Sequence, residues 1–241
     1  IRRENGERLL KEPGQVLEAL TRMNAAFSPY DLDKYLRAHT DGEAQLAAVR
    51  EKALALQELV KVFDAERHRD LYTTTQMVEL ERDLLARAER MAQSPGYRVR
   101  SSLRDQALAE SALSKEQRAA VERVTRPGYV ALLIGAAGTG KSTTLSVARE
   151  VFEADGYRVK GAALAGIAAE NLQTASGIPS RTIASYLNSW KQGRDRLTSR
   201  DVLIVDEAGM VGTRQLASVL EAAEVRHAKV ILVGDSEQAQ P

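Results

Sequence analysis

A glycine-rich stretch, placed between an apolar run and a helical segment, has the residue types and spacing of a phosphate-binding turn. Residues 135–142 read GAAGTGKS, which matches the pattern G-x-x-x-x-G-K-S in full. Glycines let backbone amides converge on phosphate oxygens, and the first amides of the following helix add partial positive charge. We therefore expect a nucleoside triphosphate here. The predicted nucleotide-binding residues are Gly135, Ala136, Ala137, Gly138, Thr139, Gly140, Lys141, Ser142 and Thr143.

Two side chains of this turn have further predicted roles. The Lys141 ammonium is placed to reach the β- and γ-phosphates, and we count it among the catalytic residues. The Ser142 hydroxyl is placed to coordinate Mg²⁺. A glycine turn without a ligand is the alternative, but the lysine and serine at the required spacing argue against it.

Two adjacent acids end the apolar run DVLIV. In a parallel sheet, ligands bind outside the carboxyl ends of the strands, so Asp206 and Glu207 are expected beside the phosphate turn. We predict that Asp206 joins Ser142 in holding Mg²⁺ and that Glu207 orients or activates the attacking water. The alternative is a pair of acids on a solvated strand end.

A third apolar strand, VILVGD, is followed by a glutamine. Gln238 lies three residues after Asp235. Its amide is predicted to hydrogen-bond the γ-phosphate or the water, which makes it the third predicted catalytic residue.

The elements that must position these residues alternate along residues 113–241. Short apolar runs of strand type, YVALLIGAA, YRVKGAALA, DVLIVDEAG and AKVILVGD, are separated by segments with helical spacing. The helices are expected to begin near Lys141, Ala168, Thr182 and Thr213. Near-continuous apolar strands are typical of a parallel sheet covered on both faces. The predicted fold class is therefore α/β, with a P-loop domain over 113–241.

Residues 1–112 have a different pattern and are predicted to form a mostly helical accessory domain with a short hairpin. Three helical segments, with Ser28 and Asp41 as N-caps and Pro29 at a first helical position, precede the strand-like runs LVKVF and DLYTT. A long helix then runs to near Pro95. This order is winged-helix-like, which indicates either DNA binding or a small helical packing domain.

Composition limits the classes of function. The 241 residues are 44% hydrophobic and 28% charged, with a net charge of +1, no cysteine and three histidines. Disulfides and cysteine zinc sites are excluded, and a nucleic-acid site must be a local groove. No apolar run is long enough to span a membrane, and the charged start lacks the apolar segment of a signal peptide, so we expect a cytoplasmic protein. The chain starts with Ile and ends just past a strand, so we expect it to be a piece of a longer protein.

Taken in order, these motifs resemble superfamily-one DNA helicases of the RecD-like branch, and most of all the helicase region of TraA/TraI-type conjugative relaxases. LSKEQRAAVERV resembles the Q-type motif, in which Gln117 would read adenine. GAAGTGKST, DEAGMV and GDSEQAQP are similar to motifs I, II and III. The resemblance is specific over residues 113–241. FSPYDLDKYLRAHTDGEAQ and YTTTQMVELERDLL look like the segment that precedes the motor in TraA-type relaxases.

The resemblance implies a RecA-like fold, ATP and Mg²⁺ as cofactors, movement on single-stranded DNA, and a bacterial cytoplasm without membrane insertion. It also implies a second RecA-like domain with an arginine finger beyond this chain, and a type IV secretion coupling protein as a further partner. Two departures weaken the expected DNA contact: Ala165-Gly166-Ile167 lacks the usual hydroxyl and cation, and Ala184 replaces a common histidine. Trp190 is expected either to stack on a base or to pack in the core.

Two other functions stay open. One is a DNA-binding or secretion-recognition module with a non-productive ATP site. The other is a different P-loop NTPase, such as a kinase or an AAA-type ATPase. In the helicase interpretation, this chain alone binds ATP weakly and hydrolyses it poorly, because the rest of the motor lies outside it.

Overall fold

The computed structural model describes residues 1–22, 24–65, 67–136 and 138–235. By their internal contacts the residues form two compact units. The first, called here the N-terminal unit, comprises Ile1–Asp83 with Gly212–Arg214. The second, called here the sheet unit, comprises Leu84–Val211 and Gln215–Pro241.

The N-terminal unit contains the predicted helices and hairpin. Its elements are α1 (Arg2–Lys11), α2 (Gly14–Thr21), α3 (Pro29–His39), α4 (Gly42–Leu54), β1 (Leu59–Asp64) and β2 (Arg69–Thr74). β1 and β2 pair antiparallel, and Phe27 adds a bridge to Tyr72 of β2. A helix, a bridging residue, two helices and a hairpin follow one another, so the winged-helix-like order is found, with α1 in addition.

The start of α3 shows why the chain folds locally as predicted. The Ser28 hydroxyl accepts a hydrogen bond from the Asp31 amide, and the Asp31 carboxylate accepts one from the Ser28 amide, while Pro29 is the first helical residue. This capping box satisfies amides that the helix leaves free. Asp41 precedes α4 as predicted, but its side chain makes no capping bond.

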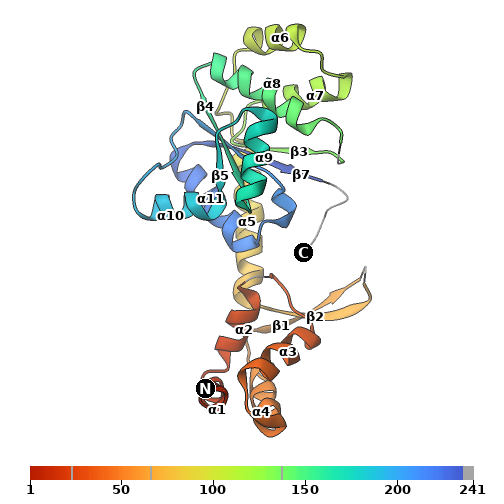
Figure 1. Ribbon diagram of the computed structural model, residues 1–241, viewed down its shortest axis with the longest axis vertical. Coiled ribbons are helices and arrows are strands. Elements are labelled where there is room, and N and C mark those ends of the chain that lie inside the picture. The colour runs from red at the N-terminus through yellow and green to blue at the C-terminus, as the bar shows by residue number, and fades with distance from the viewer. Residues whose placement is uncertain (23, 66, 137, 236–241) are drawn as a thin grey trace. The chain divides into compact units, whose positions relative to one another are not determined.

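The sheet unit is a parallel five-stranded sheet with helices on both faces (Figure 1). Its strands are β3 (Val130–Ile134), β4 (Arg158–Ala163), β5 (Ser180–Thr182), β6 (Asp201–Val205) and β7 (Lys229–Gly234), in the order β3-β7-β6-β4-β5. Its helices are α6 (Ser101–Glu110), α7 (Lys115–Val124), α8 (Lys141–Ala154), α9 (Gly166–Ser176), α10 (Ile183–Lys191) and, from Gln215 on, α11 (Thr213–Arg226), with the 3₁₀ turn η1 (Ala208–Met210). α5 (Thr75–Gln93) contributes its last turns.

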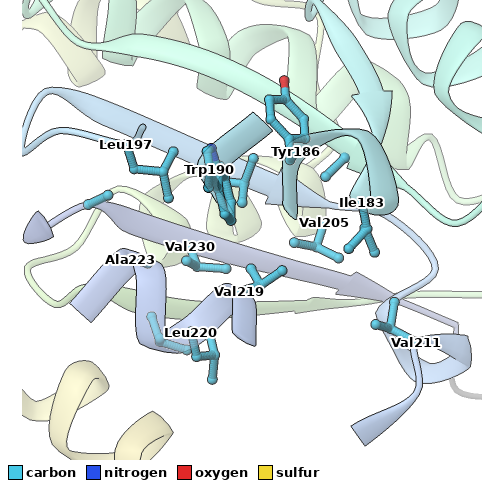
Figure 2. Packing of buried hydrophobic residues seen from close by; sticks show 14 of the residues in the cluster. Ile183, Tyr186, Trp190, Leu197, Val205, Val211, Val219, Leu220, Ala223 and Val230 are labelled. Atoms are coloured by element: carbon cyan, nitrogen blue, oxygen red, sulfur yellow. The ribbon is translucent and has the colours of Figure 1, made fainter. Parts of the chain in front are cut away.

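Alternate residues of the central strands point into two separate cores. On β6, Val202 and Ile204 pack with α7, α8 and α9, whereas Leu203 and Val205 pack with α10 and α11. Figure 2 shows the second core, in which Tyr186 and Trp190 of α10 lie over the sheet near Val205. Burial on both faces explains the continuous apolar runs, and the predicted α/β class with a parallel sheet is confirmed.

Trp190 packs in this second core. It is 9% exposed, and its indole Nε1 donates to the Asp195 carbonyl oxygen at 2.9 Å. The expectation of packing is therefore confirmed, and stacking on a base is not what this position offers.

The structure differs from the sequence-based expectations at two places. The three-residue strand β5 and the helix α6 are additional to the predicted elements. Residues 84–112 group with the sheet unit, because Tyr97 enters one sheet core and Leu108 packs against Val147 and Val151 of α8. The predicted domain division between residues 112 and 113 stays a prediction, and the compact units divide earlier in the chain.

No helix of the described residues has both the length and the apolar character that crossing a bilayer requires.

Candidate functional site

Three strands of the sheet unit end at the same edge. Ile134 of β3 pairs with Gly234 of β7, and the Gly135 amide donates to the Gly234 carbonyl oxygen at 3.2 Å. Val205 of β6 pairs with Leu232 of β7. The glycine turn after β3 and the acids after β6 and β7 therefore leave the sheet side by side, as expected for the carboxyl ends of parallel strands.

The turn itself needs glycine at two positions. Gly138 has φ 78° and Gly140 has φ 75°, in the left-handed region that residues with a Cβ rarely adopt. Gly140 is also the N-cap of α8, so the free amides of that helix start within the turn. The Thr139 hydroxyl closes the turn by donating to the Ala136 carbonyl oxygen at 2.8 Å.

Lys141 is the first residue of α8, and its ammonium folds back over the turn. Its Nζ donates to the carbonyl oxygens of Gly135 at 2.5 Å and Ala136 at 3.0 Å. Nζ also lies 3.7 Å from Oδ2 of Asp235. The side chain is 23% exposed, so the ammonium remains accessible from the cavity beside it.

The acids after β6 have an unusual backbone. Glu207 is exposed and has φ 50°, and its amide donates to Oδ1 of Asp206 at 3.0 Å. A non-glycine residue in this region costs about 1–3 kcal/mol, and such residues cluster at functional sites. The acid that the sequence predicts to be catalytic is thus one of five non-glycine residues with positive φ in the described residues.

The glycine turn and the acids after β6 and β7 line one cavity of about 400 Å³. Its lining residues are Gly138, Gly140, Lys141, Ser142, Asp206, Glu207, Gly234 and Asp235. A hydroxyl and carboxylates are the oxygen ligands that Mg²⁺ prefers, and it usually completes its shell with waters and substrate phosphates. No three histidine or acidic side chains of the described residues gather as a metal cluster, so the predicted ligands Ser142 and Asp206 would need phosphate or water oxygens beside them.

Gln117 lies against the turn rather than in the cavity. Its Oε1 accepts from the Ser114 amide at 3.0 Å, and its Nε2 donates to the Thr139 carbonyl oxygen at 3.1 Å. A Cβ on Gly140 would collide with this amide nitrogen. Gln117 thus ties the start of α7 to the turn, and its predicted contact with adenine stays a prediction.

Of the other predicted residues, Gly135, Ala136, Thr139 and Thr143 are not among those that line this cavity. Thr143 lines a separate groove beside α6. Ala137 and Gln238 lie outside the described residues. Asp235 is a cavity residue to which the sequence motifs assign no role, although the same strand-end rule that identifies Asp206 also applies to it.

The segment expected to contact DNA after β4 has little polar chemistry. Ala165 precedes α9, and Ile167 in its first turn is 75% exposed. Ala184, in the first turn of α10, is also exposed. The two sequence departures are therefore on the surface, where they leave apolar side chains in place of a hydroxyl, a cation and an imidazole.

Known proteins similar to this chain are consistent with such a site. Conjugal transfer protein TraA of Rhizobium radiobacter is 39% identical over 248 residues, which cover all of this chain and 22% of that protein. The ATP-dependent RecD2 DNA helicase of Deinococcus radiodurans is 36% identical over 137 residues, or 55% of this chain and 19% of that protein. The chain thus spans about a fifth of the length of these curated relatives. The predicted resemblance to the TraA-type and RecD-like helicase regions is confirmed.

A solved structure of a DnaB-like replicative helicase, reported with its interactions with primase, is 10% identical, with a TM-score of 0.32 over 86% of this chain and 66% of that one. That likeness is too low to support an argument. The model of the family described as AAA domain matches residues 112–241, which include the phosphate turn and both strand-end acid sites. The turn, the cavity and these matches identify a nucleotide-binding, helicase-like motor segment, and because the matched segment is more than half of the residues, the chain belongs to the AAA domain family.

Proposed function

We propose that this chain is the ATP-binding part of the motor of a DNA helicase or translocase within a conjugative relaxase. In the whole protein, ATP hydrolysis would be coupled to movement along single-stranded DNA. The relatives named above are a conjugal transfer protein and a DNA helicase, which supports both the transfer context and the DNA substrate.

One observation carries the proposal. The glycine turn, the lysine that opens α8 and acids from two neighbouring strand ends line a single cavity. Nucleotide phosphates need converging amides and a cation, while a hydrolytic site also needs carboxylates for the metal and the water. A glycine turn without a ligand would not require the acids of β6 and β7 to face it.

Each residue has a distinct part in this proposal. On nucleotide binding, Lys141 exchanges its two carbonyl partners in the turn for phosphate oxygens. Ser142 and Asp206 would hold Mg²⁺, which would neutralise charge on the phosphates. Glu207 orients the attacking water and accepts its proton, and Gln238 reports the state of the γ-phosphate.

The same proposal explains why the chain alone is expected to be a poor ATPase. An arginine from a second motor domain typically contributes about a thousand-fold or more to the rate of such reactions. The type IV secretion coupling protein is proposed as a partner of the whole relaxase rather than of this cavity.

The test compares ATP hydrolysis by the whole parent protein with and without single-stranded DNA. We expect DNA to stimulate hydrolysis. Glu207→Gln should slow it by about 10²–10⁴-fold while leaving nucleotide binding intact, because only the proton acceptor is lost. Unstimulated hydrolysis would exclude a translocase, and transfer of the phosphoryl group to a small acceptor would indicate a kinase instead.

A second candidate function has its own observation. The winged-helix-like order of the N-terminal unit supports a DNA-binding or secretion-recognition module in which the ATP site is non-productive. If Lys141→Ala left every activity of the parent protein unchanged, that candidate would replace the motor.

A further inference from the structure

Arginines gather at the edge of the sheet that the amino ends of its strands form, opposite the carboxyl ends where the nucleotide cavity lies. Arg158 begins β4, Arg200 directly precedes β6, and Arg126 and Arg226 lie within four residues of the starts of β3 and β7. These strands are adjacent in the sheet. A strand rises about 3.3 Å per residue, so this edge lies roughly 15–20 Å from the phosphate turn. With Arg98, the group is called here the basic edge: Arg98, Arg126, Arg158, Arg200 and Arg226.

Aromatic rings connect these arginines into one surface. Arg200 lies over the Tyr157 ring at 5.4 Å, and the Tyr157 hydroxyl donates to the Arg98 carbonyl oxygen at 3.1 Å. Buried Tyr97 stacks on Tyr157 at 4.5 Å and donates its hydroxyl to the Asp201 carbonyl oxygen at 2.7 Å. The edge is therefore ordered by packing beneath it.

Buried side chains also fix the backbone of the segment that contains Arg126. Buried Lys229 donates through Nζ to the carbonyl oxygens of Arg126 at 3.0 Å and Gly128 at 2.6 Å. Tyr129 in the same segment contacts the His227 ring, with centroids 5.9 Å apart. Arg126 and Arg226 thus flank a fixed pair of rings.

Most of the positive charge at this edge has no compensating acid. Arg98, Arg126, Arg200 and Arg226 are exposed, and none of them forms an ion pair with any residue in the described ranges. Two carboxylates at this edge already have other partners. Asp155 pairs with Arg100 at 2.6 Å, and fully buried Asp201 pairs with Arg158 at 3.0 Å and Lys160 at 3.4 Å.

Free guanidinium groups on a rigid surface are suited to phosphate. Each presents a planar fork of donors that matches phosphate geometry, and it is less strongly hydrated than an ammonium. Because the whole chain has a net charge of only +1, the concentration of unpaired arginines at one edge is a local feature, as a nucleic-acid site in this chain must be.

We propose that the basic edge binds the phosphodiester backbone of DNA, as a second contact separate from the nucleotide cavity. The choice of a nucleic acid rather than an acidic protein as the ligand rests on the proposed function of the parent protein on DNA. Tyr97 is buried, and the Tyr157 ring has Tyr97 and Arg200 against it, so these two rings are not open to stacking and the contact reads charge rather than base sequence.

The test measures binding of the 241-residue chain to a fluorescently labelled single-stranded oligonucleotide and to a duplex, by anisotropy between 50 and 300 mM salt. The variant is the double change Arg126→Gln with Arg200→Gln. Its matched control is Arg2→Gln with Arg8→Gln on α1, which removes the same charge from arginines that have no ion pair with described residues. Thermal unfolding of all three proteins shows whether they are equally folded.

We expect the edge variant to bind about 25-fold more weakly at 0.1 M salt. A slope of log affinity against log salt of about 0.7 per contact on a single strand corresponds to about five-fold per arginine at that salt. The slope itself should fall by about 1.4, and the control should match the unaltered chain. The preferred form of DNA is the one that shows the larger loss.

Three results would overturn the proposal: no binding to either DNA, an equal loss in the control, or an unchanged affinity in the edge variant. If polyglutamate of equal charge displaced the oligonucleotide as well as unlabelled DNA does, the edge would be a site for acidic proteins. Binding of a fluorescent ATP analogue separates this proposal from the nucleotide site, since the edge variant should retain it.

Discussion

The carboxyl ends and the amino ends of the strands form two edges of the same sheet, and these edges contain different kinds of residues. The edge after the strands has glycines, acids and a cavity of about 400 Å³. The edge before the strands has arginines and stacked tyrosines. Both edges contain non-glycine residues with positive φ: Glu207 at 50° after the strands, and Tyr97 at 61° and His227 at 53° before them. Tyr97 is buried and held by its neighbours, whereas Glu207 is exposed and has little packing to compensate its strain.

Two lysines show the same difference. Lys141 and Lys229 each donate to two backbone carbonyl oxygens. Lys141 is partly exposed beside Asp235 and faces the cavity, so its ammonium can exchange partners. Lys229 is buried with carbonyl groups alone among its hydrogen-bond acceptors in the described residues, and burial lowers its pKa to about 8. Equal hydrogen bonds thus serve a ligand site in one place and a structural core in the other.

The largest effect in this comparison is expected at Lys141. Lys141→Ala removes the cation that is proposed to bind the phosphates, and hydrogen bonds to charged groups are each worth roughly 1.5–3 kcal/mol. Two such contacts amount to about 4 kcal/mol, or about a 1,000-fold loss of affinity. Titration with a fluorescent ATP analogue in Mg²⁺ measures this loss directly.

The exposed Lys191 at the end of α10 supplies the control for this loss. Lys191→Ala removes the same charge from the same unit and should leave nucleotide affinity unchanged. If Lys141→Ala bound the analogue as well as this control does, the two edges would not differ as described, and the cavity would not be a nucleotide site.

A smaller effect, on stability, is expected at Lys229. Its folded-state pKa is lowered, so the unfolded chain binds the proton more tightly and stability should rise as the pH rises from about 8 to 10.5. The full difference is on the order of 3 kcal/mol. Lys229→Met has no proton to lose, so its unfolding free energy should not show this rise.

Urea unfolding of both proteins between pH 7 and 10 measures the difference in unfolding free energy as a function of pH. The variant also loses two hydrogen bonds to carbonyl oxygens. The test therefore compares how the unfolding free energy changes with pH, not its value at one pH. A constant difference across that range would mean that the buried ammonium carries no penalty. Lys191→Met controls for the loss of one exposed charge.

Much of the edge after the strands can be predicted from the sequence, because each of its features is local. A glycine turn before a helix and acids at the end of an apolar run are consecutive residues, so the order of residues alone identifies Lys141, Ser142, Asp206 and Glu207. The parallel sheet is predicted from the same runs. Asp235 obeys the same rule, although no sequence motif assigns it a role.

The edge before the strands cannot be predicted from the sequence, because it is assembled from distant segments. Arg98, Arg126 and Arg200 come from three loops and Arg226 from the end of α11, and only the strand order β3-β7-β6-β4 makes them neighbours. The grouping of α6 with the sheet unit has the same cause, since it depends on Leu108 packing on α8. The contact of Gln117 with Thr139 is equally hidden, because it joins residues 22 positions apart.

The smallest effect is expected from the strain at Glu207. Replacing a residue in the left-handed region by glycine removes the clash of its Cβ, worth roughly 1–2 kcal/mol, but adds about 0.5–1 kcal/mol of backbone entropy to the unfolded chain. Glu207→Gly should therefore be more stable than Glu207→Ala by up to about 1 kcal/mol, because alanine also lacks the carboxylate but keeps the strain.

Chemical denaturation of the two Glu207 variants measures this difference, and both should fail to support DNA-stimulated hydrolysis in the parent protein. A glycine variant that is stabilised and inactive would show that the strain at this edge is kept for the carboxylate, since the fold alone would be better without it. Equal stability of the glycine and alanine variants would mean that φ 50° costs nothing at this position. In that case Glu207 and Tyr97 would no longer illustrate a difference between the two edges, and only the charges and the cavity would distinguish them.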